Sequence, residues 1–295
     1  MILEVASPRT RGRNNWLRDK HAENQFTQCG EDGMLAKIFE ILGIEKGSCV
    51  ELGAADGIFM SNTRRLITEK GWSAVMIEAD SKLFSKLEQC YADRDDVQCV
   101  HTRAQFEGEN TLDDIFAAAG LPIDFDFFCL DVDGNDYHLW DSLRTYRPKL
   151  MVVEYNPTIP NEVVFVQPRD PEVTQGASLA ALVQLGKEKG YELIATTELN
   201  GFFVRKEDFH LFNIDDNCID AMRSSSGTQS HLFQLYDGTL KVAGNTNLIW
   251  QKGLPMRPRR FQVLPKALRF VSPSNRLQKY TKRFWSWLYR RKLVG

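Results

Sequence analysis

Short, unbroken runs of apolar residues alternate along this chain with segments of helical periodicity. Examples are SCVEL at 48–52, DFFCLDV at 126–132 and LMVVEY at 150–155. Strands covered on both faces of a parallel sheet read as continuous apolar runs, whereas half-exposed strands alternate. The pattern therefore predicts a doubly wound α/β fold. The predicted strands are residues 48–52, 72–79, 97–103, 125–132, 150–155, 191–197 and 201–205.

The last two predicted strands are separated only by the short segment ELN at 198–200. A parallel crossover needs a dozen or more residues, so these two strands have to form an antiparallel hairpin. The predicted fold is thus a mostly parallel, seven-stranded, Rossmann-like sheet closed by an antiparallel hairpin.

Helical spacing of apolar residues predicts the intervening helices. Ser81 and Thr111 stand where N-caps are expected, and Gly43 and Gly71 stand where helices should end. The predicted helices are residues 31–42, 62–70, 81–91, 111–119, 137–143 and 179–189.

Three regions follow from these patterns. Residues 1–24 are polar and basic and predict an N-terminal arm anchored by Trp16. Residues 25–215 form the α/β domain. Residues 216–295 form a basic extension, in which Asp237-Gly238 predicts a β-hairpin and residues 276–292 predict an amphipathic helix.

The net charge of −2 conceals a strong asymmetry. Residues 238–295 contain 14 Lys and Arg and no Asp or Glu, so the first 237 residues hold the other 23 basic residues and all 39 acidic ones, net −16. The segment RLQKYTKRFWSWLYRRK at 276–292 fits a helix on an anionic membrane surface. Docking onto the acidic body or onto a partner protein stays open, and nucleic acid is the least favoured partner because no RNA-binding module is visible.

The chain shows no compositional sign of secretion or of a membrane span. The first fifteen residues lack the apolar run of a secretory signal, and no apolar stretch approaches the roughly 18 residues of a membrane helix. Six cysteines occur singly, without zinc-ligand spacing, which is typical of reduced thiols. We expect a cytoplasmic protein, with a peripheral position at the inner membrane face as the alternative.

Residues suited to ligand binding cluster after the first two predicted strands. Glu51 is followed by the loop Gly53-Ala-Ala-Asp-Gly57, which includes Ala55 and Asp56, and the second strand ends in Glu78-Ala79. Small residues allow a close approach of ligand to backbone, and a carboxylate some 20 residues further on can accept hydrogen bonds from a ribose diol. The spacing is not the Gly-x-Gly-x-x-Gly of dinucleotide binding. Any strand–glycine–helix turn would share some of these features.

Four motifs in order resemble those of class I S-adenosylmethionine-dependent methyltransferases, and within them the FkbM-like group. They are VELGAADG (50–57), SNT (61–63), IEAD (77–80) and LDVDGND (130–136), preceded by QCGEDGMLAKIF (28–39). The resemblance covers roughly residues 25–205. It departs from the commoner pattern at Asp133 and Asp136, where Glu is frequent.

The resemblance implies S-adenosylmethionine as cofactor and assigns roles to matching positions. Glu78 would bind the ribose hydroxyls with Ala79 beside the adenine, and Asp131 would face the cofactor ammonium or the substrate. The cofactor-binding residues implied are Glu51, Gly53, Ala55, Asp56, Gly57, Asn62, Glu78, Ala79 and Asp131.

Acidic and amide side chains also follow the fourth and fifth predicted strands. Asp131, Glu154 and Asn156 stand at neighbouring strand ends, about 4.8 Å apart in such a sheet. Oxygen ligands suit Mg²⁺, which could lower the pKa of a substrate hydroxyl. The other interpretation is that these groups cap loops and bind the cofactor.

An oxygen acceptor also benefits from a general base. His138 follows the acidic motif and is the first choice for this catalytic role beside Asp131, and His101 at a strand end is the second. A structural role for either histidine is the simpler alternative.

These observations predict an S-adenosylmethionine-dependent methyltransferase acting on a hydroxyl of a sugar, glycan or other small polar molecule. The alternative is a catalytically inactive methyltransferase-like fold that binds a membrane surface or a partner. A nicotinamide-dependent dehydrogenase is disfavoured by the glycine spacing and by the closing hairpin.

Overall fold

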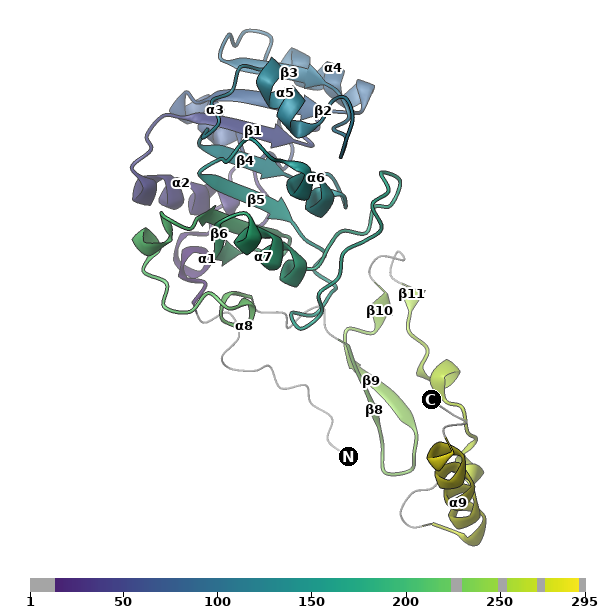
Figure 1. Cartoon of the computed structure of the whole chain (residues 1–295). Coiled ribbons are helices and arrows are strands. Elements are labelled where there is room, and N and C mark those ends of the chain that lie inside the picture. Colours follow the sequence, from purple (N-terminus) through teal and green to yellow (C-terminus); the bar gives the residue numbers. More distant parts are fainter. Residues whose placement is uncertain (1–13, 224–229, 249–253, 270–273, 292–295) are drawn as a thin grey trace. The chain divides into compact units, whose positions relative to one another are not determined.

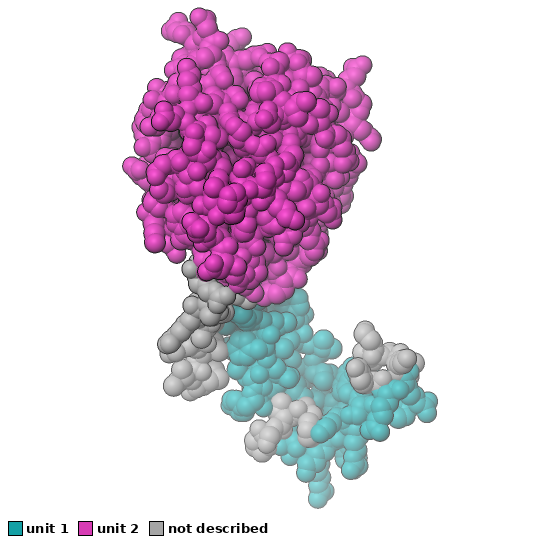
Figure 2. Space-filling view, turned by 60° about the vertical axis from the view of Figure 1, so that its left-hand side comes forward, with its two compact units in different colours: residues 1–7, 226–295 teal, residues 8–225 magenta. Residues whose placement is uncertain are grey.

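The computed structural model describes residues 14–223, 230–248, 254–269 and 274–291. The chain forms two compact units, one within residues 8–225 and the other within residues 226–295 (Figure 2). Each unit is described by itself below.

The first unit is built on a seven-stranded sheet with the order β3-β2-β1-β4-β5-β7-β6. Strands β1 to β5 are parallel, and β7 runs antiparallel between β5 and β6. The predicted Rossmann-like sheet with its closing antiparallel hairpin is therefore confirmed. The strands are β1 (Ser48–Leu52), β2 (Ser73–Glu78), β3 (Val97–His101), β4 (Phe127–Leu130), β5 (Leu150–Glu154), β6 (Tyr191–Thr196) and β7 (Asn200–Arg205).

Helices cover both faces of this sheet, with α5, α6 and α7 on one face and α2, α3 and α4 on the other (Figure 1). This double cover explains why β4 is buried at every position. The helices are α1 (Trp16–His21), α2 (Glu31–Leu42), α3 (Arg64–Lys70), α4 (Ser81–Cys90), α5 (Leu112–Ala118), α6 (Asp136–Ser142), α7 (Leu179–Glu188) and α8 (Ile219–Met222), with a 3₁₀ turn η1 (Phe209–Phe212).

Helix caps agree with the sequence patterns in part. The Thr111 hydroxyl accepts from the Asp114 N–H in a complete capping box, and Gly43 ends α2 with a left-handed φ of 68°. The predicted cap Ser81 is wrong. Asp80 caps α4 instead, because its carboxylate accepts the N–H groups of Lys82 and Leu83.

Residues 14–24, predicted as part of an N-terminal arm, belong to the α/β unit. Leu17 of α1 is fully buried, whereas the expected anchor Trp16 is only half-buried. The Asn15 side-chain amide donates 2.7 Å to the Thr196 carbonyl of β6. The buried leucine and this long-range amide bond are among the contacts that attach the segment to the rest of the unit.

The second unit contains short strands and one long helix. Strand β8 (Ser230–Gln234) pairs antiparallel with β9 (Leu240–Gly244), so the hairpin predicted around Asp237-Gly238 is present. The remaining elements are β10 (Asn247–Leu248), β11 (Leu254–Pro255), the 3₁₀ helices η3 (Pro258–Phe261) and η4 (Lys266–Leu268), and α9 (Arg276–Arg290). Across the described ranges of the chain, no helix is long and apolar enough to cross a membrane.

Candidate active site

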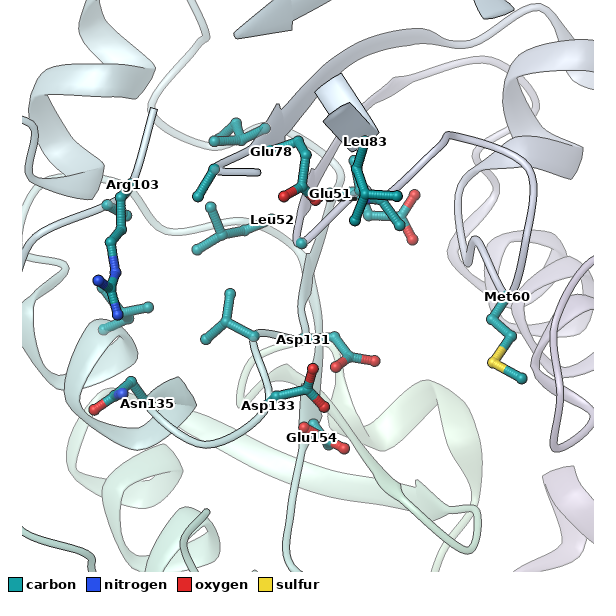
Figure 3. A pocket seen from close by; sticks show the side chains of 18 of the residues that line it. Glu51, Leu52, Met60, Glu78, Leu83, Arg103, Asp131, Asp133, Asn135 and Glu154 are labelled. Carbon is teal, nitrogen blue, oxygen red and sulfur yellow. Dashed lines mark hydrogen bonds between the residues drawn. The ribbon is translucent and has the colours of Figure 1, made fainter. Parts of the chain in front are cut away.

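A cavity of about 540 Å³ lies at the carboxyl ends of β1, β2, β4 and β5. This is the edge of an open α/β sheet where ligands bind, and the volume is typical of small-molecule sites. Figure 3 shows Glu51 and Glu78 on one side and Asp131, Asp133 and Glu154 gathered on the other. The cavity therefore presents five carboxyl groups to a ligand.

The turn after β1 is fixed by a close approach to the strand beside it. Gly53 has a φ of +87°, and a Cβ added there would lie 1.8 Å from the carbonyl oxygen of Asp131. Gly53 is thus required by backbone contact between the ends of β1 and β4, in addition to lining the cavity. Ala55, with a φ of 48°, continues the turn and also lines the cavity.

Glu51 is buried and holds the loop that follows this turn. One of its oxygens accepts the hydroxyls of Ser61 and Thr63, both at 2.6 Å, and the other accepts the Asn62 N–H at 2.8 Å. Burial raises the pKa of Glu51, and these hydrogen bonds oppose that rise. The second oxygen keeps one acceptor position for a ligand.

Glu78 is held by two backbone donors. Its oxygens accept the Ala55 N–H at 2.8 Å and the Asp80 N–H at 2.7 Å. Both oxygens keep a further acceptor position, so the carboxylate has a fixed orientation at the cavity wall. Ala79 lines the cavity next to it, together with Leu83 of α4.

Three carboxyl groups on the opposite wall come close enough to share one ligand. Asp131, Asp133 and Glu154 each offer an oxygen, and these oxygens lie within 4.8 Å of one another. Burial, and next the charge of Asp131, raises the pKa of Glu154 to about 10. Burial, followed by the charges of Asp133 and Glu51, raises the pKa of Asp131. A hydrogen bond between the two carboxyl groups raises the pKa of Glu154 further and opposes the rise in the pKa of Asp131.

The oxygen set that could hold a hard cation differs from the predicted one. Asn156 is not among the residues that line the cavity, because its side-chain oxygen accepts from Thr158 and its amide donates to the Gln175 carbonyl. Asp133 takes its place, turned inward by a left-handed φ of 56°. The three carboxyl groups match the ligand preference of Mg²⁺.

Three predicted cofactor-binding residues, Asp56, Gly57 and Asn62, do not line the cavity and contact other parts of the protein. Asp56 accepts the N–H groups of Ile58 and Phe59. Gly57 faces α4, where an added Cβ would lie 2.7 Å from both Leu87 and Tyr91. Asn62 is buried, and its side-chain amide donates a hydrogen bond to the Cys129 sulfur.

Neither predicted base lines the cavity. The His138 Nε2 lies 2.9 Å from the Gln167 carbonyl oxygen, and its ring packs edge-on against Phe106. His101 is exposed and stacks on Phe84 with centroids 4.6 Å apart. Both rings therefore make structural contacts, and the sequence hypothesis of His138 as base has no support from its position.

The long connection between β5 and α7 supplies a wall that the sequence patterns did not reveal. The Gln167 side-chain oxygen accepts the N–H groups of Gln175 and Gly176, and its amide donates to the Asn135 side chain. These bonds hold the segment whose Pro171 and Thr174 line the cavity. Such a loop has no periodicity that would reveal it in the sequence.

Apolar residues form the mouth of the cavity. Phe59 and Met60 line it, and Phe59 is 66% exposed. Met60 has a φ of 59°, an uncommon conformation for a non-glycine residue. The hydrogen bonds to Asp56 described above stabilise this turn, which presents an aromatic ring to an incoming ligand.

Solved structures that resemble part of this chain do so at low sequence identity. No family model matches the chain, and no curated protein sequence matches it. The N-terminal domain of EvdMO1 with SAH bound gives a TM-score of 0.40 at 14% identity, over 59% of this chain and 79% of that one. The same domain in the presence of SAH and D-fucose gives 0.39 at 14% identity, over 62% and 83%. A Staphylococcus aureus structure assigned as a caffeoyl-CoA O-methyltransferase gives 0.40 at 12% identity, over 58% and 81%.

Proposed function

We propose that this protein is an S-adenosylmethionine-dependent methyltransferase that methylates a hydroxyl of a sugar, glycan or other small polar molecule. The observation that carries the proposal is the convergence of Glu51, Glu78 and Asp131 on one cavity at the sheet edge. The acceptor class rests on the resemblance of the motifs to the FkbM-like group.

The nucleoside part of the cofactor fits the side of the cavity formed by β2. The Glu78 carboxylate, held by two backbone N–H groups, has acceptor positions left for the two ribose hydroxyls. Ala79, Leu83 and Ala104 line the same cavity and offer apolar contacts to an adenine ring. A preorganised acceptor pair beside a small apolar wall is the arrangement that a nucleoside requires.

The charges of the cavity suit a cationic cofactor. S-Adenosylmethionine supplies a positively charged sulfonium whose methyl group is ready for transfer. The carboxylates of Glu51, Asp131 and Asp133 attract a cation into the cavity and hold a demethylated, less positive product less strongly. Glu51 also has an acceptor position left for the cofactor ammonium.

Asp131 is the base best supported by its position. Its carboxylate lines the cavity, and its raised pKa makes it a better proton acceptor than an ordinary aspartate. The acceptor hydroxyl would pass its proton to Asp131 as its oxygen bonds to the methyl carbon, while the electrons of the broken carbon–sulfur bond stay on sulfur.

A divalent cation is the alternative to Asp131 acting as the base, because a carboxylate that holds a cation does not also accept the proton of the acceptor hydroxyl. Asp131, Asp133 and Glu154 would hold it, and it would lower the pKa of an acceptor hydroxyl. Turnover measured in EDTA and after return of Mg²⁺ tests this component. Turnover unchanged by EDTA would remove the cation from the proposal.

Calorimetry with S-adenosylmethionine tests the cofactor site directly. Glu78→Gln removes the negative charge with little change in shape. Because a hydrogen bond to a charged group contributes about 1.5–3 kcal/mol, we expect the Kd to rise about 10- to 100-fold. Glu88→Gln is the matched control, since Glu88 is exposed on α4 outside the cavity. Absence of binding by the wild-type protein would refute the proposal, and binding without transfer to any hydroxyl acceptor would favour the inactive-fold alternative.

A further inference from the structure

Helix α9 of the second unit packs within that unit through the face that carries Gln278. Gln278 is buried, and its side-chain amide donates 3.2 Å to the Lys266 carbonyl of η4. Trp285, two turns further along, is half-buried. A helical rotation of 100° per residue puts these two positions on one face. Most of the other side chains of α9 that the structure describes are exposed.

A second face of α9 is apolar and exposed. Leu277, Tyr280, Phe284 and Trp287 follow one another at intervals of three, four and three residues, which places them in one stripe. They are 52%, 65%, 55% and 47% exposed, and the rings of Phe284 and Trp287 stack with centroids 6.4 Å apart. Packing within the unit does not account for this stripe.

A third face of α9 is basic. Arg276, Lys279, Arg283 and Arg290 fall beside the apolar stripe on the side away from Gln278. No acidic residue occurs in residues 238–295, so the charge of this stripe is not balanced by a neighbouring acid on the helix. An apolar stripe flanked by a cationic one is typical of a helix that lies in a membrane interface.

We propose that α9 binds the surface of an anionic lipid bilayer. The helix lies parallel to the membrane plane, with Leu277, Phe284 and Trp287 among the upper acyl chains. Tyrosine and tryptophan suit this depth, because one part of each side chain is apolar and another is polar. The lysines and arginines contact lipid phosphates. Fifteen residues of helix span about 22 Å, which is shorter than the hydrocarbon core, so the helix lies on the membrane and does not cross it.

Other anionic partners fit the surface less completely. A nucleic acid would use the basic stripe through its phosphates, and a continuous aliphatic and aromatic stripe beside it would stay in water. The acidic residues of the chain itself would also satisfy the charges alone. An anionic lipid bilayer takes up both stripes at once, and this inference is independent of the cofactor site.

Vesicle sedimentation of the full chain tests the proposal. With phosphatidylcholine vesicles containing 30% phosphatidylserine, we expect binding at least tenfold stronger than with phosphatidylcholine alone, since each basic residue near an anionic surface adds about a fivefold gain. The double variant Phe284→Ala/Trp287→Ala should lose at least tenfold in binding. Tyr236→Ala, which removes a 77% exposed ring outside α9, is the matched control and should bind like the wild type.

The charge contribution has its own pair of variants. The double variant Lys279→Glu/Arg283→Glu should bind phosphatidylserine vesicles about 100-fold or more weakly than the wild type. Lys241→Glu, at an exposed position on β9, should weaken vesicle binding by less than about fivefold. Far-UV circular dichroism of each variant checks that the helix is retained. Equal sedimentation of the wild type and the Phe284→Ala/Trp287→Ala variant would overturn the proposal, as would tighter binding to a duplex DNA than to the anionic vesicles.

Discussion

Gly53 offers the sharpest test of how the sheet edge is assembled. Gly53→Ala introduces a Cβ that would lie 1.8 Å from the Asp131 carbonyl oxygen, where real Cβ contacts are essentially never below 3.0 Å. The turn after β1 and the end of β4 therefore have to separate by more than an ångström. Forced overpacking of this kind costs about 1–3 kcal/mol, and the left-handed φ costs a further 1–2 kcal/mol or so for an alanine. We expect the free energy of unfolding to fall by about 2–5 kcal/mol.

Gly71→Ala separates the two contributions. Gly71 also has a left-handed φ, +64°, but an added Cβ there meets no atom within 4 Å. This control should lose only the conformational part, about 1–2 kcal/mol. Urea unfolding followed by circular dichroism gives both values, and calorimetry should show weakened S-adenosylmethionine binding for Gly53→Ala alone. A loss for Gly53→Ala no greater than for Gly71→Ala would refute the reasoning that backbone contact requires this glycine.

Three further measurements test the acid cluster, the N-terminal segment and a helix cap. In EDTA, the folded protein should hold a proton on Glu154 that the unfolded chain has released. The free energy of unfolding should therefore fall as pH rises between about 5 and 10, by up to ~1.4 kcal/mol per pH unit. Glu154→Gln should flatten this slope, and an unchanged slope would count against a protonated Glu154. Leu17→Ala should lower the free energy of unfolding by about 2–5 kcal/mol, because the side chain is fully buried. Leu211→Ala, at a 38% exposed side chain, should change the free energy of unfolding by less than about 1 kcal/mol in urea. Equal losses would mean that α1 is not part of the core. Asp80→Ala should lower the free energy of unfolding by about 1 kcal/mol, and Ser81→Ala should lower it much less. The reverse order in thermal unfolding would contradict the assignment of Asp80 as the cap of α4.

The cavity differs from its sequence prediction at residues whose direction depends on turn geometry. Asp133 and Asn156 both follow strand ends, and the local sequence does not tell which one points inward. The left-handed backbone at Asp133 turns its carboxylate toward Glu154, whereas Asn156 is engaged by Thr158 and Gln175. Only folding of the two loops distinguishes them.

Contacts between distant residues explain the other differences. The place of His138 after the acidic motif favours it as a base, yet its Nε2 lies beside the Gln167 carbonyl, 29 residues away in the sequence. The polar composition around Leu17 predicts an arm, because a buried leucine and the Asn15 bond to β6 leave no periodic pattern in the sequence. Interactions of this kind join parts of the chain that no local pattern connects.

The sequence by itself determined the order and type of the seven sheet strands and of helices α2 to α7, since apolar periodicity reflects which faces are buried. It also determined the antiparallel hairpin, because three residues cannot form a crossover, and the placement of Glu51 and Glu78 at strand ends. The tertiary structure alone decided which carboxylates meet, which loop closes the cavity and which face of α9 stays exposed. These outcomes depend on side-chain direction and long-range packing, and both arise only when the chain has folded.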